Sequence, residues 1–456
     1  MSLLDSILRF LPQIKGPTEK KLPFKTKMKW TFIVLLAYFI LKHVPLYGLS
    51  AASSSQFEAL AVILAAEFGS LITLGIGPIV TSSIILQLLK GSGILKIDTN
   101  TQEGKVRFQG LQKLLAIGFI LVESIIYVGL GGLTPYEEVA GTSFYTLMQS
   151  VLVMQLILGG LLILYMDELL NKWGIGSGIS LFIAAGVSQS LFVQTFSVFV
   201  ADGAEYPVGA LPAIVMALGQ GDTGEIIIRT SAIITTFLIF AMVVWFQSMK
   251  VEIPLSFSRV GGYGMRWPLN FIYTSVIPVI LIAALLANIT ILSGFVRERF
   301  NLAFDLSQWF SPPDLIPTIL RAGTFGIDPL LYVQAVFYTI VLMLGAMVFA
   351  WFWMQSAGMD AHSQAKQIMA SGLQLSGFRK DPRIIEHILK RYIGPLTIMG
   401  GLTVGFLAAA ADVTGALTSG TGLLLAVMIV YKFYEDITRQ HLADMSPIVQ
   451  RFMGKR

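Results

Sequence analysis

The sequence predicts an all-α polytopic membrane protein, with ten transmembrane helices in two inverted five-helix halves around a central hourglass pore and one short re-entrant helix. The first observation is composition: 55% of the 456 residues are hydrophobic, the mean hydropathy is +0.73 and only 13% are charged, against about 25% charged in soluble domains. The second is the number of long apolar stretches, and the third is the distribution of Lys and Arg between them.

Ten stretches are apolar over about 20 residues, the length that a helix needs to cross about 30 Å of hydrocarbon. The first, residues 30–49, follows a basic segment but is longer than the apolar region of a signal peptide and has no small-residue cleavage site, so we expect a permanent anchor. The ten are expected to begin near Trp30, Leu71, Leu111, Tyr145, Ile175, Ile226, Asn270, Leu330, Tyr392 and Thr414.

Positive charge predicts the orientation. When the segments between the spans are sorted by alternate sides, all but five of the 32 Lys and Arg residues fall on one side. The exceptions are Arg297, Arg299 and Arg321 on the other side, and Lys42 and Arg229 near helix ends, where they can snorkel. By the positive-inside rule, both termini are expected in the cytoplasm.

Ten spans divide into five and five, and an odd number per half means that the second half enters the membrane in the opposite direction. The natural boundary is the external loop at 201–209, which gives halves of residues 1–205 and 206–456. Basic cytoplasmic loops are expected at 249–268 and 354–391. Inverted repeats around a central path are common among transporters.

A short helix is expected between the first two spans. Ser55 and Glu58 have the spacing of a capping box and Gly69 is a C-terminal stop, which bounds a helix too short to span. It is either a re-entrant segment buried in protein or an amphipathic helix on the outer surface.

Several chemistries are excluded. The chain has no cysteine, so disulfides, thiolate metal sites and cysteine nucleophiles are absent. None of the four histidines is expected at mid-membrane, which removes a Ser-His protease and a His-ligated metal. No Walker A loop is present. We therefore expect no cofactor, no metal and no catalytic residue.

Glu123 is the clear intramembrane charge, and such a residue is by default a hypothesis for a proton or ion pathway. One acid without a second group at comparable depth makes a poor relay, so a structural hydrogen bond between helices is favoured. A secondary transporter of a small solute, with Glu123 as coupling acid, remains the alternative function.

Two stretches repeat a Gly-Ile-Gly pattern, at 75–77 and 174–176. On helical spacing, each following span has a face that changes from apolar to polar, in opposite directions relative to the membrane. Two such helices would form an hourglass with an aliphatic waist, and apolar constrictions gate by dewetting. The alternative is ordinary close packing of small residues between helices.

Five motifs resemble, in order and spacing, the SecY family of protein-translocation channels, most closely its archaeal members. They are "GSLITLGIGPIVTSSIILQLL", "YMDELLNKWGIGSGISLFIAAGVSQ", "VEIPLSFSR", "GFRKDPRIIEHILKRYIGPLT" and "GTGLLLAVMIVYKFYE". The resemblance covers nearly the whole chain. It implies a passive channel in the cell membrane that translocates unfolded secretory polypeptides and releases transmembrane segments into lipid through a lateral gate.

The resemblance also implies roles for particular residues. The short helix at about 56–68 corresponds to the plug of the family, and Thr81 and Asn288 match polar positions of its lateral gate. The six positions that match the aliphatic pore ring are Ile76, Val80, Ile175, Ile179, Ile277 and Leu425.

The partners implied are SecE, a small β-type subunit similar to SecG, the ribosome, signal sequences and nascent chains, and membrane lipid. Within the basic loops, Arg259, Arg379 and Lys380 are the residues expected to contact the ribosome or a motor protein. Ribosomal RNA is polyanionic, so this contact should weaken with salt.

Overall fold

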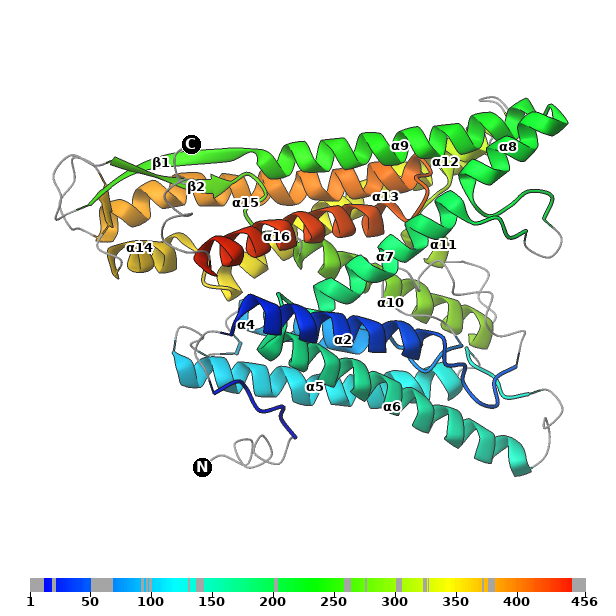
Figure 1. Cartoon of the computed structure of the whole chain (residues 1–456), viewed down its shortest axis with the longest axis horizontal. Coiled ribbons are helices and arrows are strands. Elements are labelled where there is room, and N and C mark those ends of the chain that lie inside the picture. The colour runs from blue at the N-terminus through cyan, green and yellow to red at the C-terminus, as the bar shows by residue number, and fades with distance from the viewer. Residues whose placement is uncertain are drawn as a thin grey trace.

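A computed structural model of the chain describes residues 12–18, 22–50, 69–91, 94–95, 97, 101–129, 132–136, 143–200, 204–257, 264–274, 277–300, 306–322, 326, 328–370, 373–375 and 382–444. Helices dominate these residues, as the sequence predicts, and most run along the long axis of the molecule (Figure 1). The segment expected to form the plug helix, 56–68, lies outside the described residues.

A helix occurs at each of the five spans predicted in the first half. These helices are α2 (Phe24–Lys42), α4 (Gly77–Gly91), α5 (Gln102–Gly129), α6 (Ser143–Trp173) and α7 (Gly178–Phe196). Helix α4 begins later than predicted, because the residues before Gly77 form consecutive turns.

The second half contains α9 (Thr223–Ser248), α10 (Ile277–Phe300), α13 (Pro329–Ser356), α15 (Pro382–Val413) and α16 (Gly420–Asp444) at the predicted spans. Shorter helices join them: α8 (Ala210–Gln220), α11 (Leu306–Phe310), α12 (Leu315–Ala322) and α14 (Ala361–Ala370).

Within the described residues, six helices are long and apolar enough to cross a membrane, namely α5, α6, α7, α9, α13 and α15. The other four predicted spans, α2, α4, α10 and α16, are helical but do not reach the same length and apolar content over those residues. The count of ten spans therefore stays a prediction.

A three-stranded antiparallel sheet occupies the loops for which the sequence predicted only basic character. Strand β1 (Lys250–Phe257) lies between β2 (Gly264–Asn270) and β3 (Leu373–Leu375). Ser256 pairs with Gly264 on one side and with Gln374 on the other, so the sheet joins two loops that are far apart in sequence.

The core is one large apolar cluster to which all ten helices at predicted spans contribute. A smaller cluster packs against the sheet. It includes Ile253 of β1, Leu269 of β2, Ile368 of α14 and Leu389 of α15. In Figure 1, α2, α4, α5 and α6 lie on one side of the molecule, α9, α13, α15 and α16 on the other, and α7 and α10 between them.

Candidate functional site

The first Gly-Ile-Gly pattern forms a sharp entry to α4. Thr73 N donates to Ser70 O at 3.1 Å and Gly75 N to Ile72 O at 2.8 Å, which are turn hydrogen bonds. Gly75 has a φ of +53°, a left-handed conformation that favours glycine. As a result, Ile76 lies immediately before the helix, in backbone that is not yet helical.

The second Gly-Ile-Gly pattern also contains a left-handed glycine and lies just before a helix, α7, although here the glycine follows the isoleucine. Gly176 has a φ of +74°, and Ile175 lies before the helix that begins at Gly178. The Ile175 amide donates to the Thr31 hydroxyl of α2 at 3.0 Å. Each pattern therefore places one isoleucine beside a left-handed glycine at the start of a helix.

The six residues predicted for the pore ring are all buried or half-buried, and five of them belong to or pack against the large apolar cluster. Ile76, Val80 and Leu425 are buried, with 1%, 3% and 0% exposed; with the half-buried Ile179 and Ile277 they belong to the large apolar cluster. Ile175 is also buried, at 3% exposed, but lies outside that cluster.

The two residues predicted for the lateral gate contact each other. Asn288 Nδ2 of α10 donates to Thr81 Oγ1 of α4 at 2.9 Å, and the Thr81 hydroxyl also donates to the Gly77 carbonyl in its own helix. The Glu123 side chain of α5 hydrogen-bonds to the same threonine. Three helices thus share one polar cluster, and Glu123 has the structural hydrogen bond that the sequence favoured.

Two aspartates, which the sequence did not single out, cap two of the helices that carry ring candidates, α7 and α16. Asp167 of α6 accepts from the Ile179 amide at 2.9 Å and also from the Gly178 amide. Asp412 of α15 accepts from the Gly420 amide of α16 at 2.6 Å and from the Thr421 amide. In both cases the preceding helix supplies the carboxylate, which satisfies amides that have no partner within their own helix.

Asp412 has a third partner, the hydroxyl of Tyr338, which donates at 2.8 Å from α13. A buried carboxylate requires several donors of this kind. The signal that could have revealed the two caps is an aspartate shortly before a Gly-Ser-Gly or Gly-Thr-Gly sequence, at 176–178 and 420–422.

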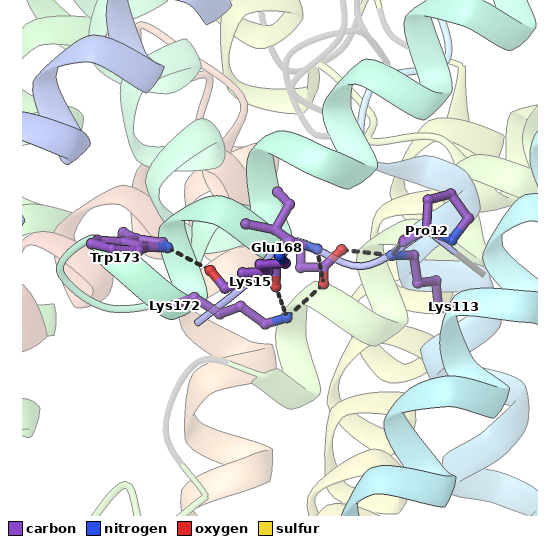
Figure 2. Close-up of polar contacts among 7 residues, drawn as sticks. Pro12, Lys15, Lys113, Glu168, Lys172 and Trp173 are labelled. Carbon is purple, nitrogen blue, oxygen red and sulfur yellow. Dashed lines mark hydrogen bonds and ion pairs between the residues drawn. The ribbon is translucent and has the colours of Figure 1, made fainter. Parts of the chain in front are cut away.

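A cluster of charged residues at the end of α6 holds the N-terminal segment (Figure 2). Glu168 forms ion pairs with Lys113 at 2.6 Å and with Lys172 at 2.7 Å. Its carboxylate also accepts from the Ile14 amide at 3.1 Å, and the indole of Trp173 donates to the Lys15 carbonyl at 2.9 Å. The segment 12–15 therefore lies across α5 at Lys113 and the C-terminal end of α6, beside the turn that carries Ile175.

The residues expected to contact a ribosome or motor protein, Arg259, Arg379 and Lys380, lie outside the described residues. The part of the chain that the structure describes includes no group of three or more His, Cys, Asp or Glu side chains that could hold a metal ion.

Comparison with known proteins identifies the family. The model of the SecY family matches residues 70–434, and a model described as the plug domain of Sec61p matches residues 36–69. The chain belongs to the SecY family. The predicted plug helix at 56–68 falls within the second match, and membership of this family confirms a multi-pass membrane protein that is not an enzyme.

Individual SecY relatives agree over almost the entire chain. The protein translocase subunit SecY of Methanothermobacter thermautotrophicus is 42% identical, over 99% of this chain and 98% of the relative. A structure described as a protein conducting channel has a TM-score of 0.81 and 39% identity, covering 98% of this chain and 99% of that one.

A second SecY-type structure, Sec61 in the canine ribosome-channel complex from the endoplasmic reticulum, has a TM-score of 0.77 and 38% identity. The alignment covers 98% of this chain and 99% of that one.

Proposed function

We propose that this chain is the channel-forming subunit of a protein translocase, which conducts unfolded polypeptide across the cell membrane and releases transmembrane segments into lipid. The observation that carries the proposal is the SecY family match. Five of the six aliphatic residues predicted for the ring, from both halves of the sequence, belong to or pack against the large apolar cluster, and Ile175 is buried as well; withdrawal of these side chains from water is consistent with a closed apolar constriction.

The ring is proposed to consist of Ile76, Val80, Ile175, Ile179, Leu425 and one residue of α10. Burial favours Ile280, which is 7% exposed, over the half-buried Ile277 one turn earlier. Ile280 is also the nearer of the two to Asn288, by about 4.5 Å of helix rise.

The lateral gate is proposed to lie where α4 packs against α10 and α13. The Thr81–Asn288 hydrogen bond joins the halves there and favours the closed gate. A polar contact between membrane helices is worth about 0.6 kcal/mol on average, enough to bias a balanced gate without locking it.

Both termini are proposed to lie in the cytoplasm, on the same side as the sheet and α14. SecE and a small β-type subunit are the proposed membrane partners. The ribosome is the proposed cytoplasmic partner, with contacts from Arg259, Arg379 and Lys380 in the basic loops.

The ring proposal is tested by conductance in planar bilayers. Replacing Ile76, Val80 and Ile179 together with serine should let small ions leak through the resting channel complex, since a polar waist holds water. Conductance that stays at background in this variant would show that these residues do not form the constriction. Replacing three buried residues away from the ring with alanine controls for general loosening; these residues are Leu152, Leu156 and Ile163 of α6.

The translocation proposal is tested with a stalled secretory chain and a photoreactive probe at position 179. A translocation channel gives an adduct with the chain, whereas a transporter of small solutes gives none.

A further inference from the structure

We propose that Lys90 determines the specificity of the channel for signal segments, by holding the end of the lateral gate nearest the sheet closed through the C-terminal carbonyl of α13. The inference rests on the proposed function. It concerns a second contact between the halves, separate from the Thr81–Asn288 pair.

The contact joins two helices of opposite halves. Lys90 is at the end of α4, and its Nζ donates to the carbonyl oxygen of Ser356, the last residue of α13. Thr81 and Lys90 are nine residues apart, or about 13.5 Å along α4 and half a turn around it. Helix α4 is therefore held on one face by α10 and on another by α13.

The chemistry of both partners favours this bond. The last carbonyls of a helix have no partner within it and carry the negative end of the helix dipole, which attracts a cation. Ser356 is 9% exposed, so little water reaches this residue in the closed arrangement. The amides of the following residues do not satisfy the Ser356 carbonyl: Ala357 N donates to Trp353 O and Met359 N donates to Met354 O.

Lys90 is also held on its own side of the gate. Its ammonium lies over the ring of Phe108 in α5, 5.7 Å from the centroid, within the range of a cation–π contact. When the halves separate, Lys90 stays with α4 and α5, so that opening breaks the bond to Ser356 and not the contact with Phe108.

The backbone beside Lys90 is shaped for close approach to α13. A Cβ atom built on Gly91 would lie 2.5 Å from Cδ1 of Phe352, closer than real contacts allow. Glycine at this position lets the end of α4 pack against the Phe352 ring at the end of α13, where the lysine reaches Ser356.

The consequence is a threshold in how apolar a signal segment must be to open the gate. A signal segment opens the gate when its transfer into lipid outweighs the closing contacts, so a weaker closure admits less apolar segments. Loss of one hydrogen bond with a charged donor should shift the ratio of closed to open gate about fivefold, or ~1 kcal/mol at about 1.4 kcal/mol per factor of ten.

The test uses cells in which the variant replaces the chromosomal copy, so that the whole complex is present. Two precursors differ only in their signal segments: one carries a leucine run, and the other has alternate leucines replaced with alanine. Pulse labelling measures the exported fraction of each. Lys90→Met should raise export of the weakened precursor about fivefold relative to the strong one, and Lys90→Arg, which keeps the donor and the charge, should match the parent.

The matched control is Lys105→Met. Lys105 is exposed on α5 near the same end, so its loss removes one positive charge without touching α13. An unchanged ratio in Lys90→Met, or an equal rise in Lys105→Met, overturns the proposal. If the parent fails to export even the strong precursor, the proposed function itself is wrong.

Gly91→Ala provides the test if Lys90→Met does not accumulate. Alanine is favoured over glycine within a helix, so α4 remains stable while the methyl group presses on the Phe352 ring of α13, which should loosen the packing of α13 against α4, and Lys90 keeps its charge. A rise in export of the weakened precursor supports the proposal, and a ratio equal to that of the parent contradicts it.

Discussion

Asn288 of α10 donates its side-chain amide to the hydroxyl of Thr81 of α4 at 2.9 Å, so a single hydrogen bond connects a helix of the second half to a helix of the first. The same hydroxyl hydrogen-bonds to Glu123 of α5. One threonine thus links the two sides of the proposed gate at the level of Val80, its neighbour in sequence.

Asn288→Ala should weaken closure, because the bond to Thr81 is lost while Glu123 keeps its own. Interhelical hydrogen bonds in membranes average about 0.6 kcal/mol, so export of a precursor with a weakened signal segment should rise about threefold. Thr81→Val combined with Asn288→Leu replaces the polar pair with apolar side chains, which can be nearly neutral. The double variant should lie closer to the parent than Asn288→Ala does; the reverse order would contradict this account of the gate.

The contribution of α10 to the ring is separable by single substitutions. Ile280→Ser should raise the resting conductance of the complex in planar bilayers more than Ile277→Ser, since Ile280 is buried and Ile277 only half-buried. Equal leaks, or a larger leak from Ile277→Ser, would assign the ring position to Ile277. The control is Ile340→Ser on the exposed face of α13, which should leave the conductance at the level of the parent.

The capping aspartates should contribute to stability through the acceptor oxygen. Asp167→Ala and Asp412→Ala each leave helix amides without a partner, which should cost about 1–3 kcal/mol and lower the thermal unfolding midpoint of the purified complex. The asparagine variants keep a side-chain oxygen in place and should lose less. Asp328, an exposed cap of α13 that accepts from Leu330 N, provides the comparison: if Asp328→Ala lowers the midpoint as much, burial adds nothing to the two caps.

The N-terminal segment should be released when its carboxylate partner is removed. Glu168→Ala eliminates the ion pairs with Lys113 and Lys172 and the bond to the Ile14 amide, so trypsin should cleave after Lys15 faster than in the parent. Glu103, exposed in the first turn of α5, is the control, and Glu103→Ala should leave the cleavage rate unchanged. Equal rates in Glu168→Ala and the parent would show that the remaining contacts suffice to hold the segment.

The positions of the helices could be predicted because each needs a long apolar run, which is a local property of the sequence. Their starting residues could not. Helix α4 begins at Gly77 and not near Leu71, because the preceding residues turn against α6, where a Cβ on Gly159 would lie 1.7 Å from the Leu71 carbonyl oxygen. The sheet was missed for a related reason: Leu255 pairs with Leu375, a partner too distant in sequence for any local pattern to indicate.

The candidate site likewise contains some residues that the sequence could predict and others that it could not. The Thr81–Asn288 pair followed from resemblance to a family, since both side chains match polar positions within it. The bond from Lys90 to Ser356 had no such signal, because the acceptor is a backbone carbonyl and every residue has one. Asp167 lay inside a quoted motif, yet its role depends on where α7 begins, which only the structure gives.

The two capping aspartates also bear on the order in which the helices fold while the chain is being synthesised. Asp167 precedes the Ile179 amide by 12 residues, and Asp412 precedes the Gly420 amide by 8. Contacts this local form early, since little loop entropy opposes them. Helices α7 and α16 can therefore each be started by the helix synthesised just before it, and α7 can be oriented while the second half of the chain is still being synthesised.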